Sequence, residues 1–306
     1  MVSYTGVFPR DQQGAQPQRL VTTLLGDYWF RRDEHLPSGA LVQLLHDFGV
    51  SAPSARAAIR RVATRGLLTT SKQGRNAAYG IPADGQDVIA SHMRTLFDFG
   101  SEPIEWDGQW TIVAFSVPEG DRDTRRALRD GLRRLQFGTL FDAVWVSPHD
   151  RGSDALALAN TLGLSNVTVI RGEELSARTI EEVVPTSFDL PAVAEKYHEF
   201  LHRYSVAWGT IDPSTVPEVH ALRLRTEIMT DWRIFPSIDP GLPDVLLPAD
   251  WPRDAARKLC MEVYDTLGAE AESRFRRVVA QYNPALAELV SHHTFADWMS
   301  TELAGR

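Results

Sequence analysis

The segment from residue 18 to 82 restricts the fold most, because its glycines, prolines and apolar repeats leave room only for short elements. Apolar residues recur at helical spacing in 18–30, 37–49 and 51–66, and only the turn FGVSA separates the last two segments. Two short strand-like stretches then flank KQGRN, which is typical of a hairpin turn. Three short helices with a tight turn before the third, followed by a hairpin, predict a winged helix-turn-helix domain at 18–82.

Charge is distributed unevenly along the chain. The 306 residues carry a net charge of −8, which by itself argues against a nucleic-acid-binding protein. The stretch 48–83, however, holds six Lys and Arg residues and neither Asp nor Glu. A basic segment in an acidic chain concentrates a local positive field. This distribution is the first indication of a module that binds the phosphates of a nucleic acid.

The third predicted helix has one apolar stripe and a basic remainder. Ala55, Ile59 and Val62 fall on the stripe, while the small Ala57 and Ala58 would let the backbone approach a base edge. Such a helix suits the major groove, where arginine pairs bidentately with guanine. The alternative is a small helical domain with a solvated basic face. The residues predicted to contact DNA are Ser54, Arg56, Arg60, Arg61 and Arg65 on the helix, and Lys72, Arg75 and Asn76 at the hairpin tip.

Residues 105–176 alternate between strand-like and helical patterns, after a linker helix within 83–104. This alternation predicts a small ferredoxin-like α+β domain. The predicted strands and helices are, in chain order, 110–119, 122–138, 142–148, 153–164 and 167–172.

The predicted helix 122–138 carries outward-facing arginines that could contact DNA or a phosphorylated ligand. Asp121, Asp123 and Asp130 interleave with them, so the pattern favours an ordinary solvated face.

The remaining residues, 177–306, are mainly helical in pattern. The whole chain is therefore predicted to be an α+β multidomain protein: an N-terminal winged helix-turn-helix, a central ferredoxin-like domain and a mainly helical C-terminal domain. The predicted C-terminal helices are 192–208, 214–233, 252–282 and 284–303, with a proline-rich connector at 234–251.

The sequence HEFLH at 198–202 matches H-E-x-x-H, in which two histidines one helical turn apart bind zinc and the glutamate acts as general base. Glu227 could supply a third ligand, so a zinc-dependent hydrolase using His198, Glu199 and His202 is the alternative function. The motif fixes only three positions and matches often by chance. The pattern of the surrounding helix places both histidines beside its packed stripe, which favours ordinary surface residues.

Two long stretches give the chain a family resemblance. The runs LLGDYW…LLHDFGVSAPSARAAIRRVATRGLL and WTIVAFSVPE…RRALRDGLRRLQFGTLFDAVWVSP, with the later DWRIFPSIDPGLPDVLLPADWP, resemble the PaaX family of transcriptional repressors. The resemblance implies a winged helix, a middle domain similar to CRISPR-adaptation nucleases and a helical C-terminal region. Those nucleases place a metal-binding aspartate near the end of their first strand, where this chain has Ser116. We therefore expect that domain to be inactive, with no catalytic residues and no metal.

The resemblance also implies an effector and a mode of action. The expected effector is a CoA thioester of an aromatic acid, phenylacetyl-CoA in the eponymous members. Such a ligand needs cations for its phosphates and an apolar slot for its ring. We expect a homodimer that binds a palindrome-like operator in double-stranded DNA, represses an aromatic-acid catabolic operon and leaves when the effector binds. A DNA-binding scaffold without an effector is the rival interpretation. The candidate effector-binding residues are Trp208, Arg223, Arg225, Trp232 and Arg233.

The composition indicates a cytoplasmic, nucleoid-associated protein. A single cysteine, Cys260, excludes an internal disulfide framework. No apolar run approaches the ~20 residues that span a bilayer, so no membrane association is expected. Residues 1–17 are polar, lack the apolar core of a signal peptide and are expected to form a loose tail. No cofactor is expected.

Overall fold

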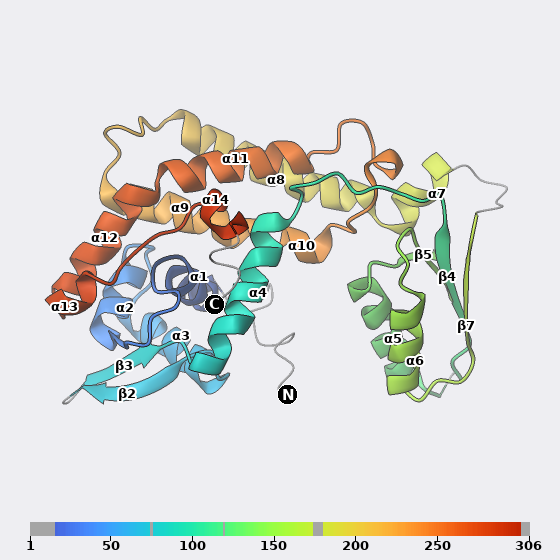
Figure 1. Ribbon diagram of the computed structural model, residues 1–306, viewed down its shortest axis with the longest axis horizontal. Coiled ribbons are helices and arrows are strands. Elements are labelled where there is room, and N and C mark those ends of the chain that lie inside the picture. The colour runs from blue at the N-terminus through green and yellow to red at the C-terminus, as the bar shows by residue number, and fades with distance from the viewer. Residues whose placement is uncertain (1–15, 74–75, 119, 174–179, 301–306) are drawn as a thin grey trace. The chain divides into compact units, whose positions relative to one another are not determined.

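The structure is a computed structural model that describes residues 16–73, 76–118, 120–173 and 180–300. It has two compact units, each with helices and one small sheet (Figure 1). The first unit comprises 1–99, 201–233 and 255–306, and the second comprises 100–200 and 234–254. The α+β multidomain class is thereby confirmed. The predicted tail falls almost entirely on residues 1–15, which lie outside the described residues.

The first unit begins with three helices and a three-stranded antiparallel sheet of order β1-β3-β2. Gly49 and Gly66 follow the second and third helices with φ of 76° and 78°, the left-handed conformation that ends helices at glycine. These elements are α1 (Gln16–Tyr28), β1 (Leu36–Pro37), α2 (Ser38–His46), α3 (Ala52–Thr64), β2 (Thr69–Gln73) and β3 (Asn76–Gly80).

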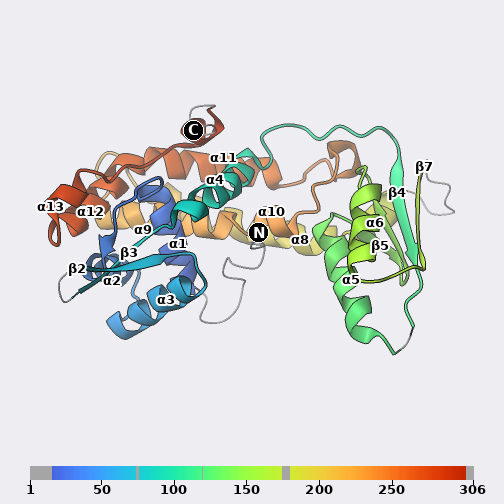
Figure 2. The same ribbon diagram turned by 60° about the horizontal axis from the view of Figure 1, so that its bottom comes forward.

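The later helices of this unit pack on the N-terminal elements and on one another. The Tyr28 ring on α1 stacks on Phe275 with centroids 4.9 Å apart, and Phe97 stacks on Trp298 at 5.4 Å. The N-terminal helices therefore share their core with segments more than 200 residues away. The packed helices are α4 (Ala83–Asp98), α9 (Glu218–Trp232), α11 (Arg253–Thr266), α12 (Gly268–Ala280), α13 (Pro284–Ala287) and α14 (Phe295–Met299) (Figure 2).

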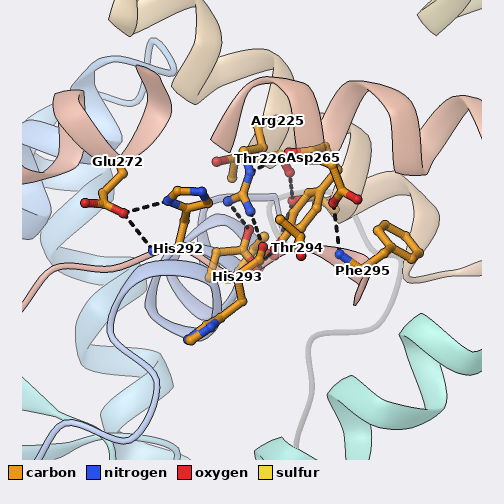
Figure 3. Close-up of polar contacts among 12 residues, drawn as sticks. Arg225, Thr226, Asp265, Glu272, His292, His293, Thr294 and Phe295 are labelled. Carbon is orange, nitrogen blue, oxygen red and sulfur yellow. Dashed lines mark hydrogen bonds and ion pairs between the residues drawn. The ribbon is translucent and has the colours of Figure 1, made fainter. Parts of the chain in front are cut away.

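Two predicted C-terminal helices are wrong in extent. The single helix predicted at 252–282 is two helices separated at Leu267, and a Cβ added at the next residue, Gly268, would lie 2.4 Å from the His292 ring. Of the helix predicted at 284–303, the described residues up to 300 form α13 and α14, joined by non-helical chain. The backbone there bonds to other elements: the His293 carbonyl accepts from Arg225 at 2.7 Å, and the His292 N–H donates to Glu272 at 3.0 Å (Figure 3).

The second unit is built on a four-stranded antiparallel sheet of order β5-β6-β4-β7. The connection from β4 through α5 to the β5–β6 hairpin, and then through α6 to β7, leaves β4 and β6 at the centre. The prediction did not include β5. The elements are β4 (Trp110–Phe115), α5 (Arg122–Arg134), β5 (Gly138–Phe141), β6 (Val144–Ser147), α6 (Gly152–Thr161) and β7 (Val167–Gly172).

Each face of this sheet has its own apolar cluster. Val113 and Trp145 pack with Leu128 and Leu132 of α5, while Trp110 and Val146 belong to the cluster on the other face. The alternation follows from the two-residue period of a strand. That second cluster also includes residues from α7 (Ile180–Ser187), from the start of α8 (Leu190–Gly209) and from η2 (Asp244–Leu246); the remaining short helix is α10 (Phe235–Ile238).

Among the described residues, no helix is both long and apolar enough to cross a bilayer.

Candidate nucleic-acid interface

Helix α3 places a row of arginines at the surface. Arg56, Arg60 and Arg61, with Arg65 at the C-cap, are all exposed. Within the described part of the chain, their side chains make no hydrogen bond and no ion pair. Guanidinium groups without protein partners keep their five donors available for an anionic ligand.

The opposite side of α3 anchors the helix in the core. Ala55, Ile59 and Val62 are at most 1% exposed, which confirms the predicted stripe. Ala58 is also buried, at 2%, so it packs on the helices beneath and cannot face a base edge as predicted. Its position, one turn before Val62, places it on the inner face.

The start of α3 is fixed by its own residues. Ser51 is the N-cap, and its hydroxyl accepts from the Ser54 N–H at 3.4 Å. Pro53 occupies the first turn, where its missing N–H costs nothing. The exposed Ser54 therefore lies at the helix N-terminus, where backbone N–H groups and the helix dipole favour an anion.

The hairpin β2–β3 supplies the second predicted contact surface. Lys72 lies on β2 and is exposed, Asn76 begins β3, and Arg75 lies outside the described residues. His35 supports the base of the hairpin, because its Nδ1 lies 2.6 Å from the Ser71 hydroxyl and its Nε2 lies 3.1 Å from the Thr69 hydroxyl.

An ion pair ties the turn before α3 to a distant helix. Asp47, the C-cap of α2, accepts two hydrogen bonds from Arg274 of α12, at 2.8 and 2.9 Å. The Asp47 side chain is only 7% exposed. Bidentate pairing of this kind fixes the orientation of the two side chains in addition to pairing their charges. Sequence reasoning missed it, since nothing local marks two residues so far apart as partners.

A buried polar cluster joins α1 to the C-terminal helices. Arg225, fully buried, lies 3.9 Å from the Asp27 carboxylate and donates to the Tyr264 and His293 carbonyls at 2.8 and 2.7 Å (Figure 3). The Tyr264 hydroxyl donates to Asp27 at 3.1 Å. Burial raises the pKa of Asp27, and the charges of Arg225 and Arg233 oppose that change.

The five residues predicted to bind an effector differ in burial and in their hydrogen-bond partners. Arg225 and Trp232 are fully buried, and the Trp232 indole donates to the Leu96 carbonyl at 3.3 Å. Trp208 is half-buried and donates to Glu262 at 2.9 Å, whereas Arg223 is exposed. Arg233 is half-buried and donates to the Thr23 hydroxyl at 2.8 Å.

The H-E-x-x-H residues lie on the surface of α8. His198 and His202 are exposed, and they flank the buried Tyr197 and Phe200 as predicted. Glu199 pairs with Lys196 at 2.8 Å. The third ligand predicted, Glu227, lies 3.6 Å from Arg203. Within the described residues no group of three His, Cys, Asp or Glu side chains is arranged to hold a metal, so the zinc alternative gains no support.

The fold and this surface define a class of protein: a multidomain α+β chain whose N-terminal module exposes a basic helix beside a hairpin. Three family models match it in sequence: PaaX-like protein at 16–85, PaaX protein central Cas2-like domain at 103–184, and PaaX-like protein C-terminal domain at 188–290. The chain belongs to the PaaX family.

Two known proteins are similar to this chain, one in sequence and one in fold. Transcriptional repressor PaaX of Escherichia coli (strain K12) is 25% identical over 268 residues, which are 82% of this chain and 80% of the relative. The solved structure of an uncharacterized protein, Rv0674, from Mycobacterium tuberculosis superposes with a TM-score of 0.55 at 22% identity. That match covers 83% of this chain and 96% of the solved one, and it supports the fold alone.

Proposed function

We propose that the chain is a DNA-binding transcriptional repressor in which α1–α3 and the β2–β3 hairpin act as a winged helix-turn-helix. One observation carries the proposal: α3 is held by a buried stripe on one side, and on the other it presents exposed arginines whose side chains have no partner among the residues that the structure describes. Membership of the PaaX family and the similarity to a transcriptional repressor support it.

The contacts divide into two groups. Arg56, Arg60, Arg61 and Arg65 read base edges and phosphates in the major groove, with Ser54 at the helix N-terminus on a phosphate. Lys72, Arg75 and Asn76 of the hairpin contact the backbone or the adjacent minor groove. Bidentate arginine contacts supply specificity, while the hairpin contributes mainly salt-dependent affinity.

The proposal also includes an oligomeric state and an effector that controls DNA binding. A homodimer presents two α3 helices to two half-sites of an operator, and the regulated genes belong to aromatic-acid catabolism, phenylacetate being the leading candidate. An aryl-CoA or acyl-CoA thioester such as phenylacetyl-CoA releases the repressor by favouring a conformation with a different half-site spacing. The second unit serves as a ferredoxin-like spacer without catalysis or cofactor. Arg225 and Trp232 have structural partners in the core, so Arg233, Arg223 and Trp208 remain as the effector candidates.

A mobility-shift titration with DNA from upstream of the chain's own gene and of neighbouring catabolic operons tests this function. The wild-type protein shifts its operator at nanomolar concentration, and Arg56→Ala or Arg60→Ala costs about 1–3 kcal/mol of specific binding. Arg277→Ala, at an arginine of α12 that is also exposed but pairs with Glu218, is the control and leaves affinity unchanged. Equal affinity of all variants for the operator contradicts the assignment to α3.

A further inference from the structure

His35 stands one residue before β1, in a stretch of chain that the helical core holds in place. The carbonyl of Glu34 accepts from the buried Trp29 indole at 2.8 Å, and Leu36 on the other side is fully buried. The antiparallel pairing of β1 with β3, continued by one residue, places His35 opposite Gly80. The His35 side chain therefore starts from a fixed point at the edge of the three-stranded sheet.

The His35 ring crosses over β3 to reach β2. A Cβ added at Gly80 would lie 2.3 Å from the ring, so a side chain at this position would displace it. On the far side of Gly80, its register partner on β2 is Thr69, and Ser71 lies two residues further along the same face. His35 thus connects the start of β1 with β2, across the strand that separates them.

Both ring nitrogens of His35 have a partner on β2. Nδ1 lies 2.6 Å from the Ser71 hydroxyl, and Nε2 lies 3.1 Å from the Thr69 hydroxyl. The Thr69 hydroxyl uses its proton elsewhere, because it donates to the Gly80 carbonyl at 3.2 Å. It can therefore only accept from His35, so Nε2 carries the proton of the neutral ring and Nδ1 accepts from Ser71. Two directed hydrogen bonds fix the position and the rotation of the ring.

We propose that His35 is a positioning residue for DNA binding, which holds β2 where Lys72 reaches the DNA backbone while α3 lies in the major groove. This role rests on the proposed function. Lys72 follows Ser71 on β2 and projects from the opposite face of the strand, so its exposed amine stays free of the His35 contacts. Strand β1 contributes two residues to the sheet, and a two-stranded hairpin is marginally stable by itself. The link through His35 to the helical core therefore determines where the basic tip of the hairpin lies.

The salt dependence of operator binding by the full chain tests this role, because each phosphate contact contributes about 0.9 to the slope of log K against log salt concentration. His35→Ala lowers the magnitude of this slope by about 1–2, the share of the hairpin contacts. Thr69→Val combined with Ser71→Ala keeps His35, removes both its partners and gives the same loss. His220→Ala, at an exposed histidine of α9, is the control and keeps the wild-type slope. Circular dichroism and urea denaturation establish that each variant is folded.

A double-mutant comparison separates positioning from general stabilisation. Lys72→Ala lowers the slope by about 0.9 in the wild-type chain and by much less in the His35→Ala chain, since the lysine there no longer reaches a phosphate. Equal effects of Lys72→Ala in both chains overturn the positioning role, as does a wild-type slope in His35→Ala. Both results leave the repressor proposal standing. A wild-type chain that binds no operator overturns the repressor proposal itself, and the role of His35 with it.

Discussion

Helices α3 and α5 are both 13 residues long and both rich in arginine, yet their arginines have different surroundings. On α3 no arginine side chain has a partner among the described residues. On α5, Arg129 pairs with Asp142, Arg133 pairs with Asp130, and Arg125 donates to the Val117 carbonyl. The comparison teaches that the number of arginines does not define a DNA-binding surface. What distinguishes α3 is that none of its arginines is paired among the described residues, whereas three of the six arginines of α5 are held by acceptors of the chain and acidic side chains lie between them.

The largest expected effect comes from substituting matched pairs on the two helices. Arg56→Ala with Arg60→Ala removes two DNA contacts and weakens specific operator binding by about 2–6 kcal/mol, since each contact contributes about 1–3 kcal/mol. Arg129→Ala with Arg133→Ala, two arginines also four residues apart on α5 but paired with Asp142 and Asp130, leaves affinity unchanged. Binding isotherms at two salt concentrations measure both. A comparable loss of operator affinity in the α5 variant would show that α5 also contacts DNA, and the two helices would then not differ in function.

The α3 surface was predictable because its signals are local. Ala55, Ile59 and Val62 fall at helical spacing, and the residues from 48 to 83 include no acid, so periodicity and charge sufficed. The central sheet was predicted less completely, since the four-residue β5 is too short to show a strand pattern.

The roles of individual C-terminal arginines could not be predicted. The sequence around Arg225 does not distinguish a ligand-binding cation from a fully buried one, because its partners Asp27 and Tyr264 are distant in sequence. The break at Leu267 was also missed, and the close approach of the His292 ring to Gly268 is a contact between residues distant in sequence. Tertiary contacts of this kind override helical pattern.

An intermediate effect is expected for the arginine that orients the turn before α3. Arg274→Ala leaves the nearly buried Asp47 without its bidentate partner and lowers the free energy of unfolding by about 1.5–3 kcal/mol. Urea denaturation measures the change. Arg277→Ala, three residues away on the same helix, removes an exposed pair with Glu218 and costs about 0–1 kcal/mol. Equal losses in the two variants would show that the Asp47 pair has no special structural role.

The smallest expected effect is on stability and concerns α5. It tests whether the paired arginines of α5 stabilise the fold without contacting DNA. Arg133 is 61% exposed, pairs with Asp130 and lies over the Trp145 ring at 5.3 Å. Asp130→Asn removes only the ion pair, so it lowers stability by about 0.3–0.5 kcal/mol, and 1 M salt abolishes the difference. Arg133→Ala also loses the ring contact, which adds about 0.5 kcal/mol that salt affects less. Neither variant changes operator affinity, because on α5 these charges already have their partners within the chain. The opposite outcome is a loss of operator binding in Arg133→Ala while Asp130→Asn binds as wild type. It would show that a paired arginine can leave its carboxylate and bind a DNA phosphate. Pairing within the chain would then no longer distinguish α5 from α3.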